Sequence, residues 1–122
     1  LPIECKRLPT PTGHKRDERE YLYSRFSTTG GVQRFKAGHH GSSHDRAAMI
    51  AYVQERDIPS WAVQLDDWID GLESDAVEGW SAADKLSLLE YDSPSRVAGL
   101  TSAHTRSSAL GGIRLDHLWI EM

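Results

Sequence analysis

The sequence predicts an α/β domain in which a mixed sheet is flanked by helices. Residues 1–8 are expected to form a strand, and residues 47–53 are a short apolar run that suits a buried central strand. From Pro59 onward, apolar side chains recur at helical spacing as far as Leu72, with carboxylates between them. Alternating strands and helices are typical of a sheet covered by helices, so the apolar run should lie beside the first strand.

Turn-forming residues and helix caps set the other boundaries. Residues 9–13 contain two prolines and a glycine and should end the first strand. Thr28 or Thr29 can cap a helix from about residue 30 to residue 40, with Val32 and Phe35 on its inner face. The remaining elements are expected in this order: a charged loop or helical turn at 14–20, a strand or helix lead-in at 21–26, a short turn from Ser81–Asp84 through 86–89, a loop around Pro94, an extended segment at 97–104, a turn at Gly111-Gly112 and a last strand at 113–120.

Composition limits the class of protein. The 122 residues are enough for one domain with a modest core. The single cysteine cannot form an internal disulfide, which favours a reducing, cytoplasmic environment. No apolar run reaches the length of a membrane-spanning helix, so we expect no membrane association.

The charge of the chain is unevenly distributed. The net charge is −4, but residues 1–46 carry nine Lys and Arg against five Asp and Glu, whereas residues 47–122 carry five against thirteen. A polyanion would be attracted to the first segment and repelled by the second. The alternative is that the acidic helices serve only solubility.

Glu4 and Lys6 are the first candidate functional residues. Side chains two apart on a strand point the same way, so the carboxylate and the ammonium should share a face, with Cys5 buried on the other face beside Ile3. A carboxylate can hold a hard divalent cation, and a nearby lysine can steady a phosphate or an attacking water. This pair suits metal-assisted cleavage of a phosphodiester.

Four blocks of sequence carry a family resemblance over nearly the whole chain. Residues 3–8 (IECKRL) resemble the third core strand of the PD-(D/E)xK nuclease superfamily, which has the restriction-endonuclease-like fold. Three further blocks are similar to parts of bacterial restriction-endonuclease-like or phage-defence proteins. These are residues 29–35 (TGGVQRF), residues 48–53 (AMIAYV), and residues 102–106 (SAHTR) followed by 117–121 (HLWIE).

The resemblance implies a Mg²⁺- or Mn²⁺-dependent DNA endonuclease of a bacterial defence or restriction system. Glu4 matches the motif carboxylate that binds the metal, the peptide carbonyl of Cys5 commonly adds a ligand, and Lys6 matches the motif lysine. Gln33 or Arg34 matches a polar position that faces the site and would brace Lys6 or a phosphate oxygen. The residues expected to contact DNA are Arg7, Arg34, Lys36, His39 and His40.

The chain departs from the family pattern because the family places an Asp on the strand before Glu4, and no residue precedes Leu1 here. We expect that residues 1–122 are the C-terminal portion of a longer nuclease-like domain whose N-terminal hairpin is missing. Alternatively, a second chain or another subunit of a defence complex completes the core, or this copy is an inactive partner-binding subunit. A secreted toxin nuclease domain with a cognate immunity protein is a further possibility.

Histidines outside the motif offer competing interpretations. Residues 37–42 (AGHHGS) also resemble a short motif of metallo-β-lactamase-fold nucleases, and His39, His40 and His44 could bind zinc. That fold needs an earlier His-x-His-x-Asp-His cluster, which is absent, so a polar loop or a substrate contact is favoured. His104 could contact DNA or a neighbouring carboxylate, and His117 is expected to be a hydrogen-bonded core residue.

Overall fold

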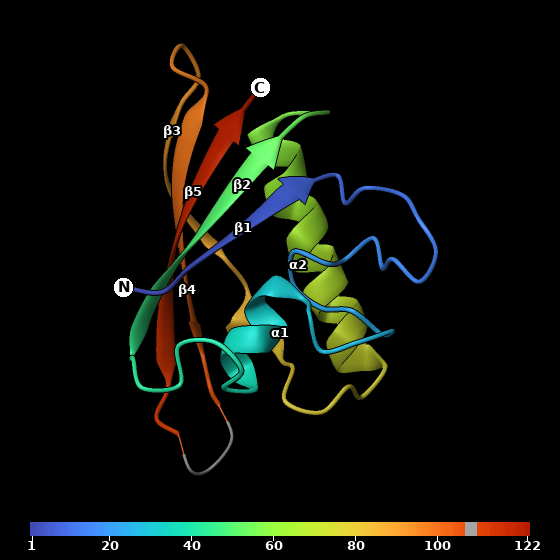
Figure 1. Ribbon diagram of the computed structural model, residues 1–122. Coiled ribbons are helices and arrows are strands. Elements are labelled where there is room, and N and C mark those ends of the chain that lie inside the picture. The colour runs from blue at the N-terminus through green and yellow to red at the C-terminus, as the bar shows by residue number, and fades with distance from the viewer. Residues whose placement is uncertain (107–109) are drawn as a thin grey trace.

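The computed structural model describes residues 1–106 and 110–122 and shows a five-stranded mixed sheet with two helices (Figure 1). The strand order is β1-β2-β5-β4-β3; β1, β2 and β5 are mutually parallel, and β4 and β3 run antiparallel to their neighbours. The elements are β1 (Ile3–Leu8), α1 (Gly31–Lys36), β2 (Arg46–Val53), α2 (Ile58–Ser74), the 3₁₀ turn η1 (Ala82–Asp84), β3 (Ser87–Asp92), β4 (Val97–His104) and β5 (Ile113–Glu121).

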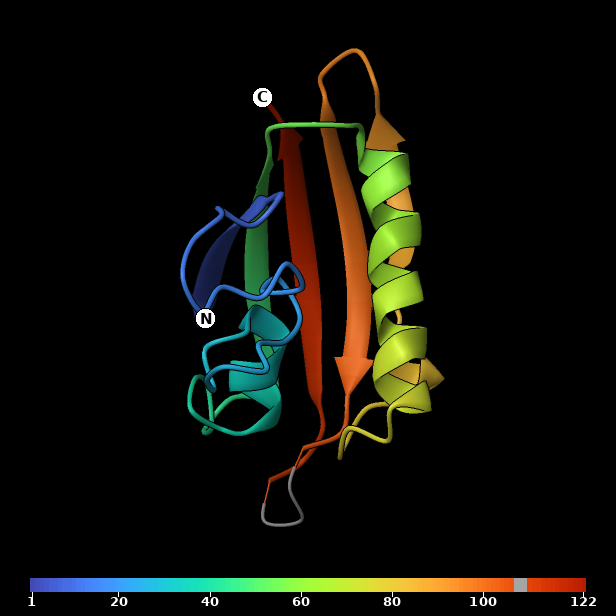
Figure 2. The same ribbon diagram turned by 90° about the vertical axis from the view of Figure 1, so that its right-hand side faces the viewer.

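Both helices cover the same face of the sheet. In Figure 2 that face is toward the viewer, with α1 on the side of β1 and β2 and α2 on the side of β4 and β3. Alternate residues of β2, such as Met49 and Ala51, are buried on this face, while Tyr52 on the other face is 37% exposed. The prediction of an α/β sheet is confirmed, and β2 does pair with β1. Burial of β2 is one-sided, however, because no described element covers the far face of the sheet.

Helix α2 forms for the reasons that its sequence indicates. The Asp57 carboxylate caps its first turn by accepting a hydrogen bond from the Ser60 amide at 2.8 Å, and Pro59 occupies the first turn, where its missing N–H costs nothing. The apolar stripe is buried against the sheet, with Leu65 and Ile69 fully inaccessible to solvent. The apolar stripe of α2 therefore packs in the core.

Helix α1 is shorter than expected. It covers Gly31–Lys36 instead of extending to residue 40, because Gly38 adopts a left-handed conformation (φ +76°) that ends the helix. Gly30 occupies the N-cap position in place of Thr28 or Thr29, and its amide donates to Oε1 of Gln33 at 2.9 Å.

The glycine at position 30 allows α1 to lie directly on the preceding loop. A Cβ atom at Gly30 would lie 2.5 Å from Cα of Tyr23, a backbone atom that cannot move independently. Gly30→Ala is therefore expected to lower the free energy of unfolding by about 1–3 kcal/mol, the usual cost of overpacking. Denaturant unfolding measures this change.

The matched control is Gly71→Ala in α2, where a Cβ meets no atom within 4 Å. Because alanine is the better helix former, this substitution should raise stability by about 0.5–1 kcal/mol. Equal effects of the two substitutions would contradict the close packing of α1.

The segment after α2 differs from expectation in one place. The turn at residues 82–84 ends at Asp84, and residues 87–92 form edge strand β3 instead of continuing the turn. The sequence of β3 did not predict a strand. Its first four residues are all exposed, so it lacks the alternation of buried and exposed residues that is typical of a half-buried strand. The loop around Pro94, the extended segment at 97–104 and the last strand are confirmed.

Candidate functional site

The side chains of Glu4 and Lys6 lie on the helix-covered face of β1, as the strand pattern predicts. β1 is an edge strand: within the described residues it has a neighbour, β2, on one side only. Cys5 lies on the opposite face and is exposed, which corrects the expectation of a buried thiol. The reason is again that no described element covers that face.

The peptide groups of β1 alternate between β2 and the open edge. The carbonyl oxygen of Leu8 accepts a hydrogen bond from the Gln54 amide at 2.8 Å, so this peptide group points toward β2. Successive residues of a parallel strand direct their N–H and C=O groups to opposite sides. The peptide carbonyl of Cys5, three residues earlier, therefore points to the open edge.

Glu4 is held by two cationic or polar groups from α1 and the loop after it. Its side chain is 13% exposed. Nη1 of Arg34 lies 3.3 Å from one carboxylate oxygen, and Nδ1 of His40 lies 2.9 Å from the other. The His40 ring stacks on Phe35 with 4.9 Å between ring centroids, which fixes its orientation. The structure thus brings together three of the predicted site residues, Glu4, Arg34 and His40, with Arg34 on Glu4 where the sequence predicted a contact to Lys6 or to a phosphate oxygen.

Lys6 lies at the other end of the same face. Its Nζ donates a hydrogen bond to the backbone carbonyl of Thr29 at 3.1 Å. Lys6 also lines a cavity of about 420 Å³, together with Arg7, Arg16 and Tyr52. The cavity lies at the open edge of β1. Three of its lining side chains are basic, and the one acidic side chain in its lining, Glu20, is paired with Arg16 at 2.6 Å.

Three other predicted site residues lie apart from Glu4 and Lys6. The side-chain amide of Gln33 contacts the start of α1 and the loop before it. Its Oε1 accepts from the amides of Gly30 and Ser24, and its Nε2 donates to the Ser24 carbonyl. Lys36, expected at the substrate, is 9% exposed and is paired in the core with Asp84 at 2.7 Å. His39 is exposed on the loop after α1.

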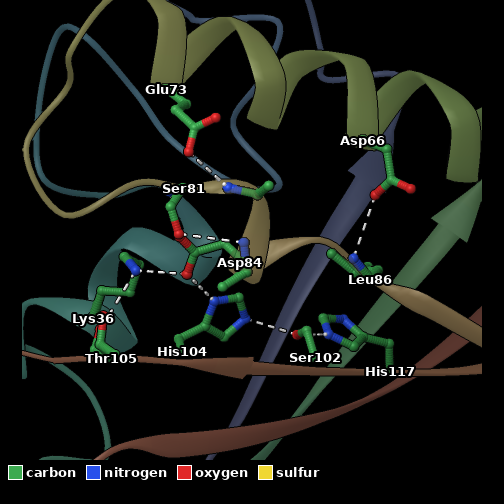
Figure 3. Close-up of polar contacts among 12 residues, drawn as sticks. Lys36, Asp66, Glu73, Ser81, Asp84, Leu86, Ser102, His104, Thr105 and His117 are labelled. Atoms are coloured by element: carbon green, nitrogen blue, oxygen red, sulfur yellow. Dashed lines mark hydrogen bonds and ion pairs between the residues drawn. The ribbon is translucent and has the colours of Figure 1, made fainter.

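A second polar cluster lies under α1, and the sequence analysis did not predict it as a unit. It is a row of hydrogen bonds, called here the buried hydrogen-bond chain, that runs between α1 and β5; Figure 3 shows its part from Lys36 to His117. All its successive contacts are between 2.6 and 3.0 Å. Its members, in order, are Lys36, Asp84, His104, Ser102, His117, Tyr21 and Trp119.

Burial controls the protonation of this chain. Burial alone would raise the pKa of Asp84, but hydrogen bonds from His104, Lys36 and the Ser81 amide outweigh it and hold the pKa below the ordinary value. Burial lowers the pKa of His104, although Asp84 opposes that change. Burial also lowers the pKa of His117 to about 3. Both imidazoles are therefore neutral at pH 7.

Within residues 1–106 and 110–122, no group of three or more His, Cys, Asp or Glu side chains is placed to hold a metal ion. His40 is directed to Glu4 and His44 contacts Ser43, so the zinc interpretation gains no support from the loop. A Mg²⁺ ion prefers several oxygen ligands, and Glu4 supplies one carboxylate whose two oxygens already contact Arg34 and His40. The described residues alone do not fit a magnesium site.

No family model, curated protein or solved structure matches this chain. As for membranes, the helices of the described part of the chain are all too short or too polar to span one.

Proposed function

We propose that β1 carries one half of a Mg²⁺-dependent DNA nuclease site, and that a carboxylate from outside residues 1–122 completes it across the open edge of the strand. The observation that carries the proposal is the arrangement on this edge strand. Glu4 and Lys6 share one face, and the carbonyl of Cys5 points to the open side. An added strand beside β1 would bring its side chains next to Glu4. The resemblance of residues 3–8 to the PD-(D/E)xK motif agrees with this proposal.

The basic groups near the edge suit a phosphodiester backbone. Lys6, Arg7 and Arg16 line the cavity beside β1, where Arg16 is paired with Glu20 at 2.6 Å, and Arg34 contacts Glu4. Ammonium and guanidinium groups bind phosphate oxygens through charge-assisted hydrogen bonds. We propose that Lys6 steadies the scissile phosphate or the attacking water, while Arg34 contacts Glu4 and a flanking phosphate. We propose that this nuclease belongs to a bacterial defence system.

A second candidate function is DNA or partner binding without cleavage. It is favoured by the contacts of Glu4, because Arg34 and His40 engage both carboxylate oxygens and leave the charge already compensated. In this case the Glu4 cluster would serve to attach α1 to β1.

The test is DNA cleavage by the native protein and by residues 1–122, with Mg²⁺ and with a chelator. Glu4→Gln keeps the shape of the side chain and removes its charge, so the proposal predicts a loss of at least about 100-fold in cleavage with DNA binding retained. Glu55→Gln, on the exposed turn after β2, is the matched control and should cleave normally.

The outcomes separate the two candidates. Cleavage that needs Mg²⁺ and Glu4 supports the nuclease. Binding of DNA by the native protein without cleavage supports the second candidate. If the native protein neither binds nor cleaves DNA, both the nuclease and the DNA-binding function are wrong, and binding to a partner other than DNA is what is left of the second candidate.

A further inference from the structure

The direction of the hydrogen bonds in the buried hydrogen-bond chain follows from Trp119, because an indole N–H can only donate. Nε1 of Trp119 donates to the Tyr21 oxygen at 3.0 Å. The hydroxyl proton of Tyr21 is then directed to its other contact, Nδ1 of His117, at 2.6 Å. His117 must accept at Nδ1, so its own proton is on Nε2, which donates to Ser102 at 2.7 Å.

The same reasoning continues to the carboxylate. Since the Ser102 oxygen accepts from His117, its hydroxyl proton is donated to Nε2 of His104 at 2.7 Å. His104 therefore carries its proton on Nδ1, which donates to Oδ1 of Asp84 at 2.7 Å. An ionised carboxylate can only accept, and Lys36 donates to the same oxygen. Every proton position is thus fixed by the two ends.

The five contacts from Trp119 to Asp84 hold five protons, one in each contact. A proton added to either imidazole would place two hydrogens in one contact and leave a buried hydroxyl without an acceptor. We propose that the buried hydrogen-bond chain is an acid-sensitive switch, in which uptake of a sixth proton separates α1 and η1 from β4 and β5. This inference does not depend on the proposed nuclease function.

Charged and titratable groups face the two imidazoles from several elements. Asp84 from η1 and Lys36 from α1 lie on the side of His104, and Tyr21 contacts His117 from the loop before α1. Asp116 of β5 also acts on His117 through its charge, although it lies on the other face of the sheet. Burial lowers the pKa of both imidazoles, which agrees with the resistance of the hydrogen-bond chain to a sixth proton.

Protons can reach the chain at its Lys36 end. Lys36 borders a cavity of about 430 Å³ that is also lined by Trp80, Thr105 and Arg106. Lys36 is 9% exposed, whereas Ser102, His104 and His117 are each less than 5% exposed. Protonation at low pH is therefore expected to begin in the half of the buried hydrogen-bond chain that contains Lys36 of α1 and Asp84 of η1.

The first test is long-range ¹H–¹⁵N NMR of the histidine rings at pH 7.5. The proposal predicts a neutral His117 protonated at Nε2 and a neutral His104 protonated at Nδ1. An imidazolium at either position, or the opposite tautomer, would overturn it.

The second test measures how acid affects unfolding. Both histidines have lowered pKa values in the fold, so protons bind more readily to the unfolded chain below its ordinary histidine pKa of about 6.5. Stability should be constant above that pH and fall below it, with the unfolding equilibrium constant rising up to about 100-fold per pH unit. His117→Gln should reduce this slope to about tenfold per unit. The exposed control His14→Gln should not change it.

A third test asks whether the number of protons in the hydrogen-bond chain, rather than the loss of packing, controls the titration of the imidazoles. Tyr21→Phe and, as the smaller change, Ser102→Ala each remove one hydroxyl proton and open a place for another. In whichever variant folds, an imidazole should take up its proton at higher pH than in the wild type. Amide exchange in α1 should also accelerate on acidification before exchange in α2 does. Unchanged titration in a folded variant, or simultaneous opening of both helices, would overturn the switch.

Discussion

Replacing Asp84 by Asn is expected to lower the free energy of unfolding by about 3–5 kcal/mol at pH 7, the usual effect of removing one partner of a buried ion pair. Lys36 is 9% exposed and its Nζ lies 2.7 Å from Asp84, so the substitution leaves a buried ammonium without its counter-charge. The Ser81 amide donates to the other carboxylate oxygen at 2.9 Å. In Asp84→Asn, the NH₂ group replaces one of the two acceptor oxygens and would face either the Lys36 ammonium or the Ser81 amide, donor against donor.

Denaturant unfolding of Asp84→Asn beside Asp67→Asn tests this prediction. Asp67 lies on the exposed face of α2, and its substitution should change stability by less than about 0.5 kcal/mol. A loss below about 1 kcal/mol for Asp84→Asn would show that the buried pair contributes little.

The sign of the pH effect at Asp84 can be stated separately. Its pKa is lowered in the fold, so the carboxylate stabilises the fold above its unfolded pKa of about 3.9, and this contribution is lost as pH falls through the folded value. The effect lies at lower pH than the effect of the histidines. Asp84→Asn should therefore flatten the stability profile mainly below about pH 4.

Local patterns predicted much of the fold. The helical stripe and the Asp57-Ile58-Pro59 start of α2, the apolar run of β2 and the last strand are all set by side chains close in sequence. Edge strand β3 was missed because its pairing with β4, rather than its own pattern, holds it in the sheet. The length of α1 was overestimated because a left-handed Gly38 ends it while polar residues continue beyond.

Part of the candidate site was predictable for the same reason. Glu4 and Lys6 share a face because strand geometry requires it, and Arg34 follows from its place on the next helix. The buried position of Lys36 depends on Asp84, which is 48 residues away in the chain. Tyr21 and His117 are 96 residues apart, so nothing local indicates their hydrogen bond. The one local signal is Ser102-x-His104, which places both side chains on the same face of β4.

Lys6 is the residue on which the proposed chemistry depends most directly. Its ammonium lies on the same face of the edge strand as Glu4 and donates to the backbone carbonyl of Thr29. Within residues 1–106 and 110–122 it is not paired with a carboxylate. Lys6→Ala should leave the fold intact, because the side chain is only partly buried. If Lys6 stabilises charge on the scissile phosphate, its removal should lower DNA cleavage by about 100- to 1000-fold.

The decisive measurement is the cleavage rate of the native protein carrying Lys6→Ala, beside wild type and Lys85→Ala. Lys85 pairs with Asp70 in the acidic part of the chain. Lys85→Ala therefore removes the same charge as Lys6→Ala, at a position far along the sequence from β1. Our account predicts that Lys6→Ala binds DNA but cleaves it at least about 100-fold more slowly, while Lys85→Ala cleaves at the wild-type rate. Cleavage by Lys6→Ala at more than about a tenth of the wild-type rate would contradict the assignment of this strand as a nuclease half-site.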